Sequence, residues 1–425
     1  MQALAGILDI LRAGHWLTHE RVRRVALALV CAYLVGFGCL AVTADGFVDA
    51  FGRPLGTDFS NVYAAGTYVL EGRAHAPFDP ALQYAREQAI FGADTPFYGW
   101  HYPPFFLFVA AALALLPYGL ALAVWQLTTF LLYLTSIRLI LAATPARTGL
   151  AADDRAQSYL PLLLAAAFPA VFVNLGHGHN GFLSAALMGA ALVMLDRRPT
   201  AAGILFGLLI YKPQFGLMIP FVLAATGRWR AFAAATATAV LLVLVATWAF
   251  GPQVWEAFAA STQFTRAVVL EAGDPGWHKI QSVFSWVRMW GGSVATAYML
   301  QGAVTLAVGI TLIRLWRSTA PFALKAAALC LSAMLASPYG YDYDMMIVAP
   351  AIAFLASDCL THGWRPWDKT ALAALWLVPI VARGIASATF IPLAVIIMIA
   401  LYIAILRRAA IDTREPRQAP AVAAP

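Results

Sequence analysis

One aspartate stands out among residues that could take part in a reaction. Asp58 lies in the stretch GTDFSNVYAAG (56–66), directly after the first long apolar run. The pattern predicts a helix starting here, and the positive end of a helix keeps a nearby carboxylate ionised. An ionised carboxylate can take a proton from a hydroxyl group. Asp58 is therefore predicted to be a general base, to cap the helix, or to do both.

A lysine forms the second candidate feature. Lys212 lies in LLIYKPQFGLMIP, where Pro213 removes a backbone donor and breaks the helix. At such a break the side chain either extends harmlessly to the membrane surface or provides a fixed cation for a phosphate group. Gln214 lies two residues further along the chain, and we place it in the same predicted phosphate-binding region.

Other polar residues gather in short turns between apolar runs. The turn NLGHGHNG (174–181) contains an H-x-H pair, which is weak as a metal site because it has two ligands and no spaced carboxylate. We therefore predict no metal, and hydrogen bonding to phosphate or sugar competes with simple loop polarity there. Two aspartates in SPYGYDYD (337–344) either cap the next helix or bind sugar hydroxyls. The residues predicted to bind the donor phosphate or sugar, besides Lys212 and Gln214, are His101, Tyr102, His179, Asn180, His278, Lys279, Asp342 and Asp344.

The composition predicts the elements that must position these residues. The chain has 425 residues, of which 61% are hydrophobic and only 12% are charged. A soluble domain usually has about 25% charged residues, so the composition predicts a polytopic membrane protein. The apolar runs do not alternate with period two, so we expect helices rather than a barrel. The fold class is therefore all-α, with about 12 membrane-spanning helices.

Charge gives the predicted orientation. The net charge is +7, but the basic residues are scattered over short loops, which excludes a nucleic-acid partner and follows the positive-inside rule. The apolar run 103–116 is interpreted as a half-helix in the outer leaflet, since a full span there would turn several later arginine pairs outward. With this choice most of the 28 Lys and Arg residues face inward, and more than half of the 21 Asp and Glu residues face outward. The predicted spans are 25–43, 119–141, 157–174, 181–195, 200–211, 214–227, 231–250, 293–313, 319–336, 343–357, 370–386 and 388–406.

This topology predicts one membrane domain over residues 1–410 and a disordered tail over 411–425, with both termini cytoplasmic. Two large outer segments result, 44–118 and 251–292, and the first contains two amphipathic helices at 59–71 and 80–91. Almost no charge lies in the middle of a span, which disfavours an ion-coupled transporter. The candidate residues instead gather on the outer face, around a cavity that opens outward.

A cavity with one carboxylate base, several cations and aromatic side chains suits sugar transfer from a lipid phosphate. A phosphate leaves readily when its charge is stabilised, so no acid is required and one carboxylate is enough. Glycoside hydrolysis, in contrast, usually needs two carboxylates.

Several stretches, in their order, resemble glycosyltransferase family 87, a family of integral-membrane enzymes in the GT-C superfamily. The resemblance covers roughly residues 57–350 and rests on GTDFSNVYAAG, WHYPPF (100–105), GHGHNGFL, LDRRPTAAGILFGLLIYKPQFGLMIP (195–220) and SPYGYDYD. One departure is His177, where many family members have Gln.

The resemblance implies a polyprenyl-phosphate-linked sugar donor, typically mannose, and an inverting transfer that needs no metal or other cofactor. It implies that Asp58 is the base, that the Lys212–Pro213 turn contacts the donor phosphate, and that 103–116 is a juxtamembrane helix. The expected partners are the lipid bilayer, the lipid-linked donor and a lipid or glycan acceptor. The expected location is the plasma (inner) membrane, with the active site on its periplasmic face.

Two other functions stay open from the sequence. A transporter or flippase of lipid-linked sugars would need polar residues at mid-depth, and few are present. A polysaccharide ligase or polymerase would use arginines and a histidine of the second outer segment, for which Arg266, His278 and Arg288 are candidates.

Overall fold

The fold is helical throughout the part of the chain that the structure, a computed structural model, describes: residues 2–143 and 159–414. In these residues backbone pairing between extended segments is limited to three isolated bridges. The predicted all-α class is confirmed.

The elements follow one another along the chain with few long connections. They are α1 (Gln2–Ala13), α2 (His19–Thr43), α3 (Thr57–Leu70), η1 (Ala76–Phe78), α4 (Pro80–Phe91), η2 (Pro104–Phe106), α5 (Leu107–Ala114), α6 (Tyr118–Ala142), α7 (Leu160–Ala166), α8 (Pro169–His177), α9 (Gly181–Met194), α10 (Pro199–Leu208), η4 (Leu209–Tyr211), α11 (Pro213–Gly216), α12 (Ile219–Ala225), α13 (Trp229–Phe250), α14 (Gln253–Phe264), η5 (Thr265–Glu271), η6 (Trp277–Lys279), α15 (Val283–Met289), α16 (Val294–Arg317), α17 (Phe322–Leu335), η7 (Asp342–Ile347), α18 (Val348–His362), α19 (Asp368–Thr389) and α20 (Leu393–Arg414).

Seven helices of the described residues are long and apolar enough to cross a membrane. They are α2, α6, α13, α16, the continuous segment Asp342–His362, α19 and α20. Helices α7 and α8, bent by 44° at the break between them, form an eighth if the pair is one span. The chain is therefore a multi-pass membrane protein.

The predicted number of twelve spans is not confirmed, because four of the apolar runs fold into helices shorter than a span. The runs at 181–195 and 319–336 become α9 and α17, of 14 residues each, whereas about 20 residues are needed to cross the hydrocarbon layer. The runs at 200–211 and 214–227 are interrupted, the second at Leu217–Met218, so that none of their helices exceeds 10 residues. A prediction from hydropathy alone depends on the number of apolar residues in a run and does not detect these breaks in the helix. The start of the predicted span 157–174 lies outside the described residues.

The first outer segment folds largely as predicted. The two expected helices, 59–71 and 80–91, are α3 and α4. The run 103–116 forms the turn η2 and the 8-residue helix α5, which is too short to span. Helix α5 packs closely on α3, since a Cβ on Gly66 would lie only 2.1 Å from the carbonyl oxygen of Ala110. This contact fixes the helix that carries Asp58.

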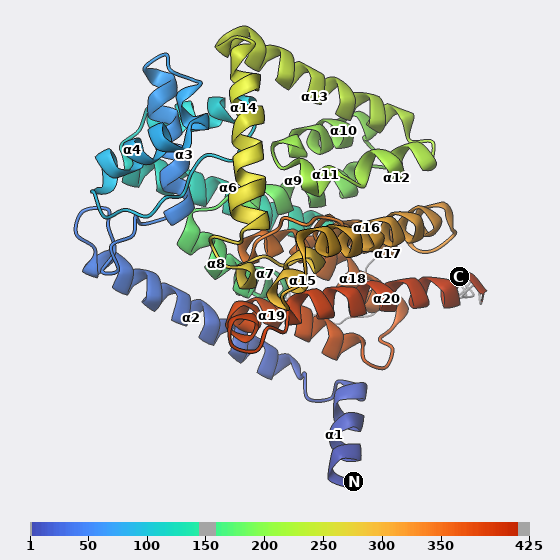
Figure 1. Ribbon diagram of the computed structural model, residues 1–425. Coiled ribbons are helices and arrows are strands. Elements are labelled where there is room, and N and C mark those ends of the chain that lie inside the picture. The colour runs from blue at the N-terminus through green and yellow to red at the C-terminus, as the bar shows by residue number, and fades with distance from the viewer. Residues whose placement is uncertain (1, 144–158, 415–425) are drawn as a thin grey trace.

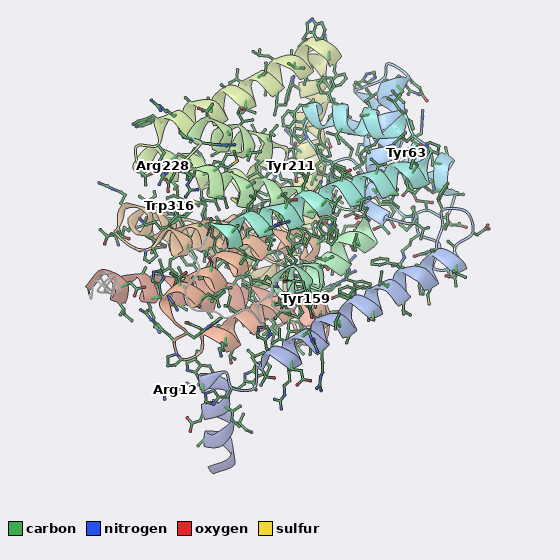
Figure 2. All side chains as sticks on the ribbon, turned by 180° about the vertical axis from the view of Figure 1, so that it is seen from behind. Arg12, Tyr63, Tyr159, Tyr211, Arg228 and Trp316 are labelled. Atoms are coloured by element: carbon green, nitrogen blue, oxygen red, sulfur yellow. The ribbon has the colours of Figure 1, made fainter. Side chains whose placement is uncertain are left out.

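The helices leave two distinct ends to the bundle. Figure 1 shows α3 and α4 together at one end and the end of α20 at the opposite one. From behind, Tyr63 of α3 lies at the first end, and Arg228 and Trp316 lie toward the other (Figure 2). There the Arg228 guanidinium stacks 5.7 Å from the Trp316 ring and pairs with Asp196. Which end faces outward stays a prediction.

The predicted disordered tail begins too early. Helix α20 continues to Arg414, four residues into the segment 411–425. Its last turns are held by ion pairs: Arg365 Nη2 lies 2.5 Å from Asp412 Oδ1, and Arg408 pairs with Asp358 and Asp368. Residues 415–425 lie outside the described residues, and the single domain over 1–410 stays a prediction.

Candidate active site

Asp58 lies in the first turn of α3. The N-cap of this helix is Gly56, with φ of 70° and no side-chain capping bond, so Asp58 is not the N-cap that the sequence left open. The Tyr118 hydroxyl donates to the Leu55 carbonyl at 2.5 Å and holds the chain before the helix. The carboxylate of Asp58 therefore lies beside the free N–H groups at the helix start.

The nearest partner of Asp58 is a histidine. Nδ1 of His177 lies 3.8 Å from Asp58 Oδ1 and hydrogen bonds the Thr57 hydroxyl at 2.7 Å. The Asp58 side chain is 18% exposed. The carboxylate is thus oriented on one side and still open to an incoming group.

The turn after His177 is held by an asparagine that the sequence analysis did not single out. Asn174 Nδ2 donates to the His179 carbonyl at 3.0 Å, and its Oδ1 accepts the Gly181 N–H at 2.8 Å. Gly178, with φ of 61°, lies against α3, and a Cβ there would come within 2.6 Å of Phe59. The turn and the start of α3 are therefore fixed to each other.

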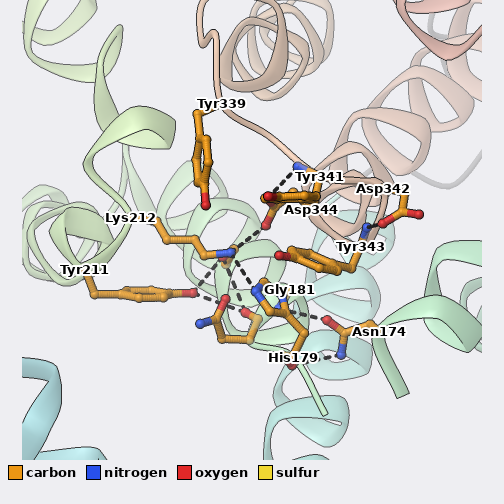
Figure 3. A network of polar contacts seen from close by, with 12 residues as sticks. Asn174, His179, Gly181, Tyr211, Lys212, Tyr339, Tyr341, Asp342, Tyr343 and Asp344 are labelled. Carbon is orange, nitrogen blue, oxygen red and sulfur yellow. Dashed lines mark hydrogen bonds and ion pairs between the residues drawn. The ribbon is translucent and has the colours of Figure 1, made fainter. Parts of the chain in front are cut away.

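Lys212 lies at the centre of a buried network (Figure 3). Its Nζ lies 2.5 Å from Asp344 Oδ1 and 3.2 Å from His179 Nε2. The side chains of Lys212 and Asp344 are only 7% and 2% exposed. Asp344 also accepts the Tyr341 N–H at 2.9 Å, which caps η7. Lys212 thus already has an anionic partner, and a donor phosphate would compete with Asp344 for it.

His179 is neutral in this network. Burial, followed by the charge of Lys212, lowers the pKa of His179 well below its usual range. Because Lys212 can only donate, Nε2 of His179 accepts, and the proton is on Nδ1. That N–H has no hydrogen-bond partner among the described residues, and neither has Oδ1 of the adjacent Asn180.

A pocket of about 410 Å³ opens beside this network. Six of the residues predicted to bind the donor line this pocket: His101, Tyr102, His179, Lys212, Gln214 and Asp344. Its remaining wall is largely apolar and aromatic, with Tyr339, Tyr341 and Tyr343, and it includes Arg266 of the π-helical segment η5. Asp58, Asn180, Asp342, His278 and Lys279 are not part of its lining.

His101 and Tyr102 are the pocket residues that come from the predicted outer segment 44–118, together with Pro103. Nδ1 of His101 hydrogen bonds the Thr265 hydroxyl at 2.9 Å, and Nε2 contacts the Tyr98 carbonyl at 3.2 Å. Burial lowers the pKa of His101, so the ring is neutral and links the two outer segments. The Tyr102 hydroxyl lies 3.4 Å from Nε2 of His179.

A buried glutamate behind this loop was missed by the sequence analysis. Glu87 on α4 accepts the N–H groups of Tyr98 and Gly99, at 3.0 and 3.1 Å. Gln83 donates both to Glu87 and to the Asn61 carbonyl of α3. Burial raises the pKa of Glu87 to about 7. The Gln83–Glu87 pair thus joins the helix of Asp58 to the loop that precedes His101, and the only signal in the sequence is two polar residues one helical turn apart.

Asp342 points the other way from Asp344 (Figure 3). Its Oδ2 lies 3.5 Å from Nη1 of Arg383, a residue of α19 that the sequence analysis did not consider. Lys279 and His278 belong to η6, which is joined to the same turn by a bridge between Ile280 and Tyr341. The predicted residues therefore form two groups, one around the pocket and one around Asp342.

The ring of Tyr343 lies between the two groups. Its centroid is 3.7 Å from that of His179 and 5.2 Å from that of His177. The rings of His177, Tyr343 and His179 thus form a line of contacts from the Asp58 partner His177 to the Lys212 network. The sequence prediction that no metal takes part is untested by this geometry and stays a prediction.

Comparison with known proteins gives the chain a family. A model of glycosyltransferase family 87 matches residues 100–338, more than half of the 425 residues. The matched part contains Lys212, His179 and Lys279, whereas Asp58, Asp342, Asp344 and Arg383 lie outside it. Searches of curated proteins and of solved structures found no match. The chain belongs to glycosyltransferase family 87 and is a membrane-embedded glycosyltransferase.

Proposed function

We propose that the enzyme transfers a hexosyl group, specifically mannosyl, from a polyprenyl-phosphate-linked donor to a hydroxyl of a lipid or glycan. The reaction is an inverting single displacement on the outer face of the plasma membrane, with Asp58 as the base. The donor's polyprenyl chain lies in the bilayer and its sugar enters the pocket.

The observation that carries this proposal is the difference between Asp58 and the other carboxylates nearby. Asp344, Asp342 and Glu271 each have a lysine or arginine within 4 Å, namely Lys212, Arg383 and Arg266. Among the described residues Asp58 has no lysine or arginine within 4 Å; its partner is His177, at 3.8 Å, and its side chain is 18% exposed. A carboxylate that is not held by a lysine or arginine and is partly exposed can be reached by an incoming hydroxyl and can accept its proton.

In the proposed step the acceptor oxygen attacks the anomeric carbon on the side opposite the phosphate. Asp58 takes the acceptor's hydroxyl proton as the new C–O bond forms. The bond between the anomeric carbon and the phosphate oxygen breaks, and the electron pair leaves with the polyprenyl phosphate. His177, fixed by Thr57, orients the Asp58 carboxylate, and cations nearby stabilise the charge on the leaving phosphate.

The pocket supports a sugar as the group transferred. Its volume of about 410 Å³ falls in the usual range for small-molecule sites, about 300–1,000 Å³. The Nδ1–H of His179, a residue of the pocket lining, is a buried donor without a partner among the described residues. Buried polar groups are normally hydrogen bonded, and a sugar hydroxyl can satisfy this donor. The three tyrosines of the 337–344 turn offer aromatic faces for the sugar ring.

The test is transfer of radiolabelled mannose from polyprenyl-phosphate-mannose into lipid and glycan acceptors, in membranes containing the enzyme. We expect Asp58→Asn to reduce the rate by about 10²–10⁴-fold, the usual contribution of a general base. The matched control is Asp94→Asn, which changes an exposed carboxylate of the same outer segment and is expected to keep wild-type activity. Full activity in a stably inserted Asp58→Asn protein would remove Asp58 as the base. If the wild-type enzyme transfers sugar only from a donor that carries another sugar, that sugar takes the place of mannose in the proposed reaction.

A further inference from the structure

A charged residue lies inside a helix that is otherwise apolar. Arg383 belongs to α19, one of the candidate spans, whose window has a mean hydropathy of 1.7. It lies six residues before the end of the helix at Thr389. A charge within a span is costly and usually has a function. Helix α19 contacts α8, η6 and η7, the elements that carry His177, Lys279 and Asp342.

The contact between Arg383 and Asp342 leaves most of the guanidinium free. A single nitrogen, Nη1, approaches Oδ2 of Asp342 at 3.5 Å, and the Arg383 side chain is 43% exposed. Asp342 uses its other oxygen to accept the Tyr343 N–H at 3.0 Å. A guanidinium has five N–H donors in a fixed planar arrangement that matches phosphate oxygens. Several of those donors remain open here.

Lys279 adds a second cation at the same junction. The Gln281 N–H donates to the Gly340 carbonyl at 2.7 Å, which fixes the end of this segment to the turn that contains Asp342. The ammonium group of Lys279 has no hydrogen bond or ion pair among residues 2–143 and 159–414. Partial burial, followed by the charge of Arg383, lowers the pKa of Lys279, while the charges of Asp342 and Asp58 oppose this. The ammonium group of Lys279 is thus open to an incoming anion, and Asp58 is close enough for its charge to act on Lys279.

A chain of contacts connects these cations with the proposed base. Asp342 is followed by Tyr343, whose ring makes an edge contact with the His177 ring, and His177 lies beside Asp58. Lys212, in contrast, lines the pocket but already has Asp344 as a close partner, and its side chain is only 7% exposed.

Resting on the proposed function, we infer that Arg383 and Lys279 together bind the phosphate of the lipid-linked donor and stabilise it as it leaves. The two cations and Asp342 give a net charge of one positive unit, which matches the single negative charge of a phosphodiester. When the bond to the sugar breaks, the phosphate becomes a monoester with a charge of about −1.5 to −2. The free N–H donors of Arg383 and the unpaired ammonium of Lys279 can then form stronger charge-assisted hydrogen bonds. Binding therefore increases as the charge develops, which lowers the barrier.

The test measures binding of farnesyl phosphate, a soluble short-chain polyprenyl phosphate, to the purified full-length protein in detergent. Because binding needs no turnover, the result does not depend on the donor sugar or on the transfer assay. We expect Arg383→Gln and Lys279→Gln each to raise the Kd at least about tenfold, the loss of a charge-assisted hydrogen bond. Arg383→Lys, which keeps the positive charge, should raise the Kd less than Arg383→Gln does. Farnesol, which lacks the phosphate, should bind all variants equally.

Two further variants separate phosphate binding from a purely structural ion pair. Asp342→Asn removes the carboxylate that competes with the phosphate. If Arg383 binds phosphate, this variant should have a lower Kd for farnesyl phosphate than wild type. If the ion pair is only structural, its Kd should rise as much as in Arg383→Gln. Arg228→Gln is the matched control, since this arginine also pairs with an aspartate but lies in other surroundings, beside Asp196 and Trp316. Wild-type affinity in both Arg383→Gln and Lys279→Gln would overturn the inference. If wild-type protein binds farnesyl phosphate through these residues but transfers no sugar from polyprenyl phosphate, the proposed function fails and the phosphate site stands.

Discussion

Two aspartates of one turn, separated by a single tyrosine, form ion pairs of opposite character. Asp344 and Lys212 are sealed in the core, with side chains 2% and 7% exposed and 2.5 Å between their charged atoms. Asp342 and Arg383 are 3.5 Å apart, and the arginine side chain is 43% exposed. The turn alternates direction, so the two carboxylates reach different surroundings (Figure 3).

The difference assigns different roles to pairs that look alike in sequence. A buried pair is stable only while both charges are present, because a lone buried charge is strongly unfavourable. Such a pair fixes the packing and has little capacity to bind anything else. A half-exposed pair contributes little to stability, and its cation is free to exchange one anion for another. We therefore expect the Lys212 pair to affect folding and the Arg383 pair to affect the ligand.

The largest effect should come from breaking the sealed pair. Lys212→Met leaves the Asp344 carboxylate buried without its cation, which typically costs about 3–5 kcal/mol. The measurement is thermal unfolding of the purified protein in detergent, and we expect a clearly lower Tm and a lower yield of inserted protein. The double variant Lys212→Met with Asp344→Asn should recover much of this loss, because it removes the charge and keeps an acceptor for the Tyr341 N–H. A single variant that unfolds like the wild type would show that the pair is not sealed.

A third carboxylate sharpens the comparison, because Glu87 is buried without any cation among the described residues. Its partners are Gln83 and two backbone N–H groups. Burial raises its pKa from 4.5 in the unfolded chain to about 7. The folded state therefore binds the proton more tightly, and its stability is highest below pH 4.5 and falls as the pH rises to about 7. The loss is on the order of 3 kcal/mol, because one pKa unit corresponds to about 1.4 kcal/mol.

Thermal unfolding between pH 4.5 and 8 tests this expectation. Glu87→Gln imitates the protonated side chain and should give a flatter pH profile, with a gain over wild type that grows from about pH 4.5 and is complete above about pH 7. The matched control is Glu71→Gln, which changes a half-exposed glutamate of the same segment that pairs with Arg86. Parallel profiles for wild type and Glu87→Gln would show that Glu87 is ionised throughout.

The same comparison shows which features of the fold and of the site could be predicted from the sequence. The apolar runs predicted the helical class, and GTDFSNVYAAG predicted the helix that carries Asp58, because these are local patterns. Lys212 and Asp344 were each singled out, since polar residues beside apolar runs are unusual. Their contact was not predicted, because 132 positions separate them and only the packing of α9, η4 and η7 brings them together.

The residues that sequence reasoning missed were concealed by ordinary local patterns. Arg383 lies in a run that reads as a generic span, and nothing nearby indicates that it faces Asp342. Gln83 and Glu87 lie one turn apart on an amphipathic helix, a spacing typical of a solvent-exposed face, yet both are buried. The predicted number of twelve spans was not confirmed for a related reason, since helix length depends on breaks such as Lys212–Pro213 and on tertiary packing.

The smallest effect should come from breaking the open pair, and it is the most informative one for the comparison. Arg383→Gln removes a half-exposed contact at 3.5 Å, and exposed ion pairs contribute about 0–1 kcal/mol. We expect a Tm close to wild type, measured in the same detergent as Lys212→Met. A Tm decrease as large as that of Lys212→Met would mean that both pairs serve the fold, and the distinction between a sealed and an open side of the turn would be lost. Because the two aspartates belong to one turn, this contrast depends on their surroundings alone: burial makes one pair structural, and exposure leaves the other free to meet a phosphate.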